Sequence, residues 1–164
     1  MKTGRMLNFE IPKASFPISS SILIPQTEPF ELVDELIDAS ENHAISRFTI
    51  PGNHILLEDN ELQESGILEN MAQTCALHSG FISTTFLNKD ESRNEGLKIP
   101  VGYIGALNDV EFYQRPLCGE ILETHIKVQH KIGTASVVAC EVFLKSICIA
   151  KGSLKIFIVE NNRA

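Results

Sequence analysis

The chain has 164 residues, of which 43% are hydrophobic and 21% are charged, and its formal net charge at pH 7 is −7. These values are typical of one soluble globular domain with a single core, and the acidic balance argues against proteins that bind nucleic acid or an anionic membrane surface. No apolar run approaches the roughly 20 residues that span a bilayer, and residues 1–16 lack the apolar segment of a signal peptide, so a cytoplasmic protein is expected.

The cysteines are not arranged as a metal or redox motif. No two of them form a Cys-x-x-Cys pair, which argues against a zinc site and against a thioredoxin-like centre. We expect reduced and mostly buried thiols at Cys75, Cys118, Cys140 and Cys148.

The beginning of the chain predicts an irregular start. Residues 1–20 lack clear periodicity and are predicted to form a loosely attached arm, which leaves residues 21–164 as a single domain. Pro25 and Pro29 indicate an irregular segment in front of residues 31–38, whose apolar spacing fits either a helix or a strand.

The next part predicts one strand and one loop. Residues 43–51 alternate between apolar and polar side chains and end at a Pro-Gly step, as a half-buried strand would. Residues 54–65 carry four acidic side chains and read as a solvated loop. His54 lies in this loop, but its spacing from the carboxylates matches no standard ligand set, so no metal is expected there.

The rest of the chain predicts one helix followed by a sheet. Residues 66–87 form one long predicted helix, and residues 88–98 are polar and mixed in charge, as in an exposed connection. From 99 to 159 the chain is rich in β-branched residues and is broken at intervals by glycine, which predicts about four antiparallel strands. With one or two strands before the helix, the pattern predicts an α+β fold in which a curved antiparallel sheet surrounds one central helix.

Glu69 is unusual in this apolar helix. Ala72, Ala76 and Gly80 form a stripe of small side chains that is expected to press against the sheet, and Glu69 borders this stripe. Burial raises the pKa of a carboxyl, whereas a helix N-terminus stabilises its anion, so a carboxylate between the two can exchange a proton near neutral pH. The alternative is that Glu69 only caps the first turn together with Ser65.

Three motifs, in order along the chain, resemble the β-hydroxyacyl-acyl carrier protein dehydratases. The helix matches the Glu-x-x-Ala-Gln pattern of that family's central helix at Glu69, Ala72 and Gln73. The segment in front of the helix resembles the family's Leu-Pro-His-Arg-x-Pro-Phe-Leu-Leu-Val-Asp motif at Pro25, Pro29, Phe30, Leu32, Val33 and Asp34. The segment after it resembles the Phe-x-Arg-Pro-x-x-x-Gly turn at Phe112, Arg115, Pro116 and Gly119, and the resemblance covers about residues 23–159.

This resemblance implies a hot-dog fold and a dimer with acyl tunnels at the subunit interface. It implies a 3-hydroxyacyl thioester substrate, carried by acyl carrier protein, and neither a metal nor an organic cofactor. In the family, a histidine of one subunit removes the α-proton while the helix glutamate of the other helps the hydroxyl to leave as water. The corresponding catalytic residues here are His54 and Glu69, and Gln73, Gly66 and Tyr103 are predicted to bind substrate.

The chain also departs from the family pattern. It has no His-Phe-Pro-Gly loop, and it resembles the divergent dehydratase-like proteins of aryl polyene and flexirubin pigment clusters. Three functions therefore stay open: a dehydratase, a non-catalytic subunit that binds an acyl chain or completes a partner's site, and a thioesterase. The assembly is expected to be a homodimer, a higher oligomer or a heterodimer with a paralogue, and the candidate side chains for carrier docking are Arg47, Arg93, Lys98 and Arg115.

Overall fold

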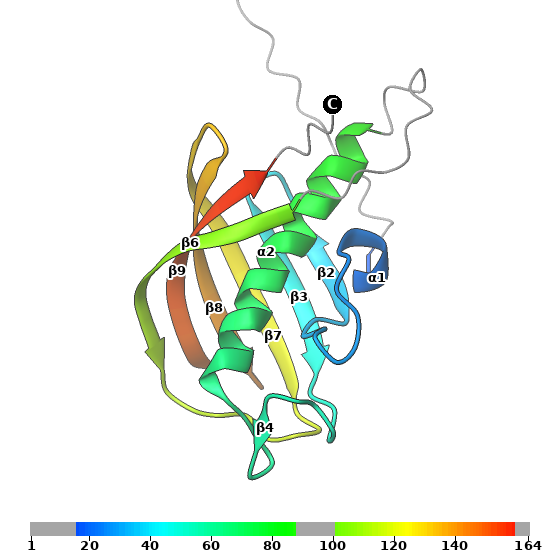
Figure 1. Cartoon of the computed structure of the whole chain (residues 1–164), viewed down its shortest axis with the longest axis vertical. Helices are drawn as coiled ribbons and strands as arrows, with labels where there is room; N and C mark the ends of the chain where they lie inside the picture. The colour runs from blue at the N-terminus through cyan, green and yellow to red at the C-terminus, as the bar shows by residue number, and fades with distance from the viewer. Residues whose placement is uncertain (1–15, 88–100, 160–164) are drawn as a thin grey trace, which may run out of the picture.

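The structure is a computed structural model that describes residues 16–87 and 101–159. Its main sheet is antiparallel, has seven strands in the order β1-β2-β3-β7-β8-β9-β6, and curves around helix α2 (Figure 1). The sheet strands are β1 Ile18–Ser19, β2 Glu35–Ala39, β3 His43–Thr49, β6 Val101–Phe112, β7 Ile121–Ile132, β8 Ala135–Leu144 and β9 Ile147–Val159. The other elements are the hairpin strands β4 Leu57–Glu58 and β5 Glu61–Leu62 and the helices α1 Ser20–Leu23 and α2 Glu64–Leu87.

The predicted α+β architecture is confirmed, and the strands show why it forms. Side chains on β3, on β8 and on the first part of β7, residues 121–128, alternate between buried and less buried positions, so every second residue there packs under the helix. The fully buried helix side chains that meet them include Ile67, Met71 and Leu77. Burying a side chain of this size contributes about 1.5–3 kcal/mol, so the helix is held mainly by this packing.

Several boundaries differ from the predictions. The carbonyl of Gln63 accepts a hydrogen bond from Ile67 N, so the helix starts two residues early and Ser65 is not its N-cap. The predicted loop at 54–65 contains the β4–β5 hairpin, and its Leu62 is fully buried. The open question at 31–38 resolves to a strand that starts at Glu35. The sheet also has three strands before the helix instead of one or two.

The stripe of small residues on α2 faces two different elements instead of the sheet alone. A Cβ at Gly80 would lie 2.3 Å from the carbonyl oxygen of Leu23, so Gly80 faces α1 and not the sheet, contrary to the prediction. Ala72 and Ala76 are half-buried and line a hollow of about 50 Å³ against Tyr103 and its neighbours on β6 and β9. The stripe faces two different elements because the sheet covers only part of the helix and the N-terminal segment covers the rest.

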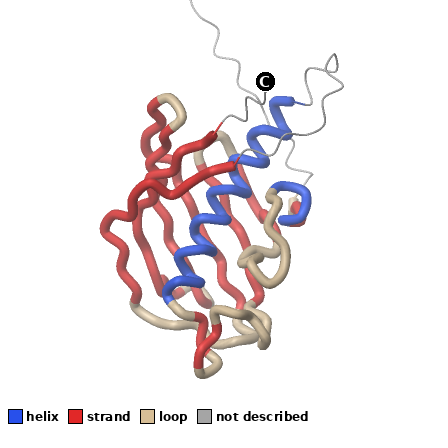
Figure 2. The backbone as a smooth tube through the Cα atoms, viewed as in Figure 1, coloured by secondary structure: helices blue, strands red, loops and turns tan. Residues whose placement is uncertain are grey.

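The N-terminal segment belongs to the folded part of the chain. Of the predicted arm, residues 1–15 lie outside the described residues, as do the predicted connection at 88–98 and the side chains of Arg93 and Lys98. Within the described part, β1 pairs with β2, and α1 with the following loop runs beside α2 (Figure 2).

Strand β6 is an edge strand of the main sheet. Among the described residues it pairs with β9 alone, and Tyr103, Ile104 and Leu107 are exposed along it. A long edge strand with exposed apolar side chains is a surface that proteins normally cover. Within the described ranges, no helix is long and apolar enough to cross a membrane.

Candidate functional site

Glu69 lies in the second turn of α2 and is half-buried. Gln73, one turn further along the same helix face, donates a hydrogen bond from Nε2 to Glu69 Oε1 at 2.8 Å. A residue that only capped the helix would direct its carboxylate to the backbone N–H groups of the first turn. Glu69 Oε1 instead accepts from a side chain located away from the helix end, so the capping interpretation is not supported by these contacts.

The amide of Gln73 is almost fully engaged by protein groups. Gln73 is 2% exposed, its Oε1 accepts from Leu32 N at 2.8 Å, and its Nε2 also donates to Phe30 O at 2.7 Å. Three of its four hydrogen-bonding positions are therefore used. Gln73 was predicted to bind substrate, and the structure shows that its amide ties the carboxylate to the segment in front of β2.

A second buried amide was missed by the sequence analysis. Asn70 donates from Nδ2 to Leu32 O at 2.7 Å and accepts from Thr124 Oγ1 at 2.5 Å. Thr74 closes this polar row with a hydrogen bond of 2.8 Å to Asn70 O. Polar residues at positions 70, 73 and 74 share one face of an otherwise apolar helix, and that spacing was the signal that could have revealed the row.

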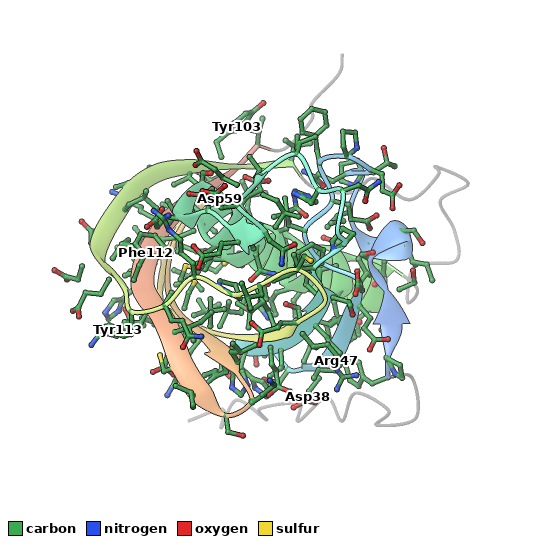
Figure 3. The ribbon with its side chains drawn as sticks, turned by 90° about the horizontal axis from the view of Figure 1, so that it is seen from below. Asp38, Arg47, Asp59, Tyr103, Phe112 and Tyr113 are labelled. Atoms are coloured by element: carbon green, nitrogen blue, oxygen red, sulfur yellow. The ribbon has the colours of Figure 1, made fainter. Side chains whose placement is uncertain are left out.

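The remaining predicted binding residues have different surroundings. A Cβ at Gly66 would lie 2.5 Å from Leu62 Cδ1, so the glycine allows the β5 strand to pack against the helix. Tyr103 is 61% exposed on the β6 edge, on the opposite side of the molecule from Arg47 (Figure 3). Phe30, which follows Pro29 and bonds to Gln73 through its carbonyl, carries an aromatic ring that is 64% exposed.

His54 lies in a tight turn that precedes β4. Its Nδ1 accepts a hydrogen bond from Leu56 N at 3.1 Å, which places the proton of the neutral ring on Nε2. Its side chain is 7% exposed and meets the ring of Phe48 edge-on, with the centroids 6.1 Å apart. Within the part of the chain that the structure describes, Nε2 is buried without a hydrogen-bond partner, and no hydrogen bond joins His54 to Glu69.

The two described arginines proposed for carrier docking already have partners. Arg47 Nη1 lies 2.9 Å from Glu35 Oε1. Arg115 makes a forked contact with Glu64 at 2.9–3.0 Å, which raises the pKa of Arg115 and lowers that of Glu64. Both pairs are at the surface, where water screens them, so the arginines remain accessible to a partner.

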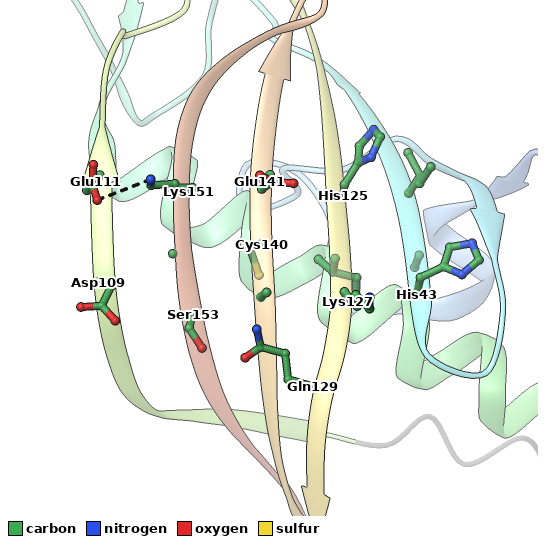
Figure 4. A pocket seen from close by; sticks show the side chains of 15 residues that line it. His43, Asp109, Glu111, His125, Lys127, Gln129, Cys140, Glu141, Lys151 and Ser153 are labelled. Carbon is green, nitrogen blue, oxygen red and sulfur yellow. Dashed lines mark ion pairs between the residues drawn. The ribbon is translucent and has the colours of Figure 1, made fainter.

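A groove of about 630 Å³ lies on the sheet face that points away from α2 (Figure 4). One row across its strands places His125, Glu141, Lys151 and Glu111 directly opposite one another. Lys151 Nζ lies 3.6 Å from Glu111 Oε1, so these two opposite charges of the row form a pair. The groove is separated from Glu69 by the sheet, and we do not assign the catalytic site to it.

No cluster of three or more His, Cys, Asp or Glu side chains suited to a metal ion occurs among the described residues. The residues that the geometry brings together are thus Glu69, Gln73, Asn70 and the backbone of Phe30 to Leu32. This group can hold one carboxylate in a fixed orientation against the segment in front of β2.

Solved structures resemble this chain in fold. The dehydratase heterocomplex ApeI:P from Xenorhabdus doucetiae matches with a TM-score of 0.72 and 17% identity over 88% of this chain and 93% of that chain. The protein smu.793 from Streptococcus mutans UA159, bound to acetyl CoA, matches with a TM-score of 0.59 and 15% identity over 83% and 95% of the two chains. A hypothetical thioesterase with coenzyme A from Streptococcus pneumoniae TIGR4 gives 0.58 and 10% identity over 76% and 84%.

These neighbours and the antiparallel sheet around one long helix show that the chain has the hot-dog fold. No curated protein sequence matches the chain. The family model of the ApeP dehydratase matches residues 18–164, which include every predicted site residue, and the chain therefore belongs to the ApeP-like dehydratase family.

Proposed function

We propose that this dehydratase-like protein acts on 3-hydroxyacyl thioesters in polyene or fatty acid synthesis, with Glu69 as its acid–base group. The observation that carries the proposal is the half-buried Glu69 carboxylate, which is held through Oε1 by Gln73. Among the described residues, Oε2 has no hydrogen-bond partner and is available to a substrate. The family match and the dehydratase named in the ApeI:P structure support the same reaction class.

The proposed reaction removes water from the 3-hydroxyacyl group. A base takes the α-proton from C2, the C3–O bond breaks, and the protonated Glu69 gives its proton to the leaving hydroxyl, so that water and a 2-enoyl thioester form. The negative charge that develops on the thioester carbonyl needs backbone N–H donors, as in other enolate-like intermediates. Acyl carrier protein is the proposed carrier of the substrate.

His54 is the proposed base, as the resemblance implies. A base must reach the proton that it removes, directly or through one water. Because His54 Nε2 is enclosed in this chain, the turn at 51–57 has to open before the ring can reach a substrate. That observation favours a second candidate function, in which this chain supplies Glu69 to a shared site and the partner subunit supplies the base.

The chain is proposed to work in a dimer that includes a second hot-dog subunit. Within the described part of the chain, the outer edge of β6 has no partner strand and exposes Tyr103, Ile104 and Leu107, so it provides a surface on which a second sheet can continue. The ApeI:P structure is a heterocomplex, which supports a paralogue as the partner.

The test is hydration of a 2-enoyl thioester by the purified chain, alone and mixed with a hot-dog paralogue from the same genome. Glu69→Gln is expected to leave the fold intact and to reduce turnover at least about a hundredfold, the usual scale for general acid–base catalysis. Activity only in the mixture favours the shared site. Full activity of Glu69→Gln contradicts the catalytic assignment, and release of free thiol without hydration identifies a thioesterase instead.

A further inference from the structure

We propose that Gln73 is a positioning residue that gives the two oxygens of Glu69 different tasks and fixes the carboxylate relative to Phe30. This inference rests on the proposed function, because the task of the second oxygen is to carry the proton of the dehydration. It adds to that function a role for Gln73, which orients the Glu69 carboxylate without itself touching the reacting atoms.

The orientation of the Gln73 amide is determined by the backbone. Its Oε1 accepts from Leu32 N, so the NH₂ group must lie on the other side, where it donates to Phe30 O and to Glu69 Oε1. Rotating the amide by 180° would place its oxygen against the Phe30 carbonyl and its NH₂ against the Leu32 N–H, and both contacts would be repulsive. One arrangement of the amide is therefore allowed.

This arrangement separates the roles of the Glu69 oxygens. Oε1 faces an N–H donor at 2.8 Å, so it acts as an acceptor whether the carboxyl is charged or neutral. The proton that the dehydration transfers is then carried by Oε2. The same amide donates to the Phe30 carbonyl at 2.7 Å, so the backbone of Phe30 and the Glu69 carboxylate are held by one group.

Asn70 provides a matched comparison within the same helix. It lies three residues before Gln73, is fully buried, and holds the same residue, since its Nδ2 donates to Leu32 O at 2.7 Å. Its other contact goes to Thr124 and not to Glu69. Both amides stabilise the segment in front of β2, but only Gln73 contacts the carboxylate.

The first experiment uses this comparison. Gln73→Glu and Asn70→Asp each keep the oxygen that accepts a hydrogen bond and lose the NH₂ donor. Both variants are expected to lose stability in urea unfolding. Only Gln73→Glu is expected to lower kcat by about tenfold to a hundredfold with little change in KM, the scale of a misplaced catalytic group, and a Glu69→Gln background should abolish this difference.

The second experiment needs neither turnover nor a variant at position 73. In ¹⁵N–¹H spectra of the folded protein, Glu69→Gln replaces the carboxyl acceptor of the Gln73 hydrogen bond by an amide, so one Gln73 side-chain proton should change its chemical shift while the Asn70 pair stays in place. Equal shifts at both amides, or none at Gln73, would overturn the inference. Equal kcat losses in Gln73→Glu and Asn70→Asp would overturn it while leaving the proposed function intact. If the NMR shift occurs as expected but no mixture hydrates the thioester, the contact between Gln73 and Glu69 is supported and the dehydratase function is rejected.

Discussion

Replacing Gly80 with alanine tests whether α1 is part of the framework that holds the site. The added Cβ would lie 2.3 Å from the carbonyl oxygen of Leu23, 3.1 Å from its carbonyl carbon and 3.2 Å from its Cα. These are backbone atoms, so no side-chain rotation can relieve the contact. The segment cannot easily withdraw either, because Leu23 is 1% exposed and Ser20 N donates to Asp34 O at 2.9 Å.

The magnitude follows from two opposing terms. Alanine in a helix interior is favoured over glycine by about 1 kcal/mol. Overpacking of a well-packed contact costs about 1–3 kcal/mol, and a contact with backbone belongs at the upper end. We therefore expect Gly80→Ala to lower the free energy of unfolding by about 2 kcal/mol, which corresponds to a decrease of about 4–8 °C in Tm for a chain of this size.

The assay is urea unfolding, followed by the midpoint and the m value. The control is Gly52→Ala, because a Cβ at Gly52 would have no heavy atom within 4 Å and its φ is not positive. That variant is expected to be neutral or slightly stabilised, by less than about 1 kcal/mol. A Gly80→Ala variant as stable as the native chain would show that α1 does not pack on α2 as described.

Two further predictions concern pH and assembly. Burial lowers the pKa of His78, whose ring Nε2 lies 2.9 Å from Ser40 O, so the unfolded chain binds a proton at this residue more readily than the folded chain does. The free energy of unfolding that neutral His78 contributes is therefore complete above about pH 6.5 and is lost as the pH falls below it. In urea unfolding at pH 7.5 and pH 5, His78→Gln should flatten the decrease seen in the native chain, and an unchanged pH slope would contradict this. Leu107→Asp on β6 should dissociate the proposed dimer in sedimentation, whereas Ile132→Asp, at a position 79% exposed on the β7 end, should not; equal behaviour of the two would argue against the β6 interface.

Local contacts of the site could be predicted from the sequence, and distant ones could not. The four-residue spacing of Glu69 and Gln73 places them on one helix face, and the structure has them 2.8 Å apart. The hydrogen bonds of Leu32 to Asn70 and Gln73 join residues that are 38 and 41 positions apart, and no local pattern encodes that pairing. Periodicity also shows that Gly80 is on a small-residue face but does not identify the element that covers it.

The β4–β5 hairpin was missed although a signal for it was present. Asp59 and Asn60 both have positive φ, 50° and 69°, as a two-residue type I′ turn requires. Leu57 pairs with Leu62 across this turn, and Leu62 is buried against Gly66. The acidic composition of the segment concealed the hairpin, because its charges lie on the exposed positions of the turn.

The proposed function has two forms, which differ in whether His54 or the partner subunit supplies the base. A buried N–H without a partner costs about 1–3 kcal/mol, and His54 Nε2 is in that position among the described residues. If His54 is the base, this buried N–H is satisfied only when the turn at 51–57 opens onto a substrate, whereas in the shared site it stays enclosed and the partner subunit supplies the base. His54→Ala is therefore expected to reduce turnover in the first case and to leave it unchanged in the second.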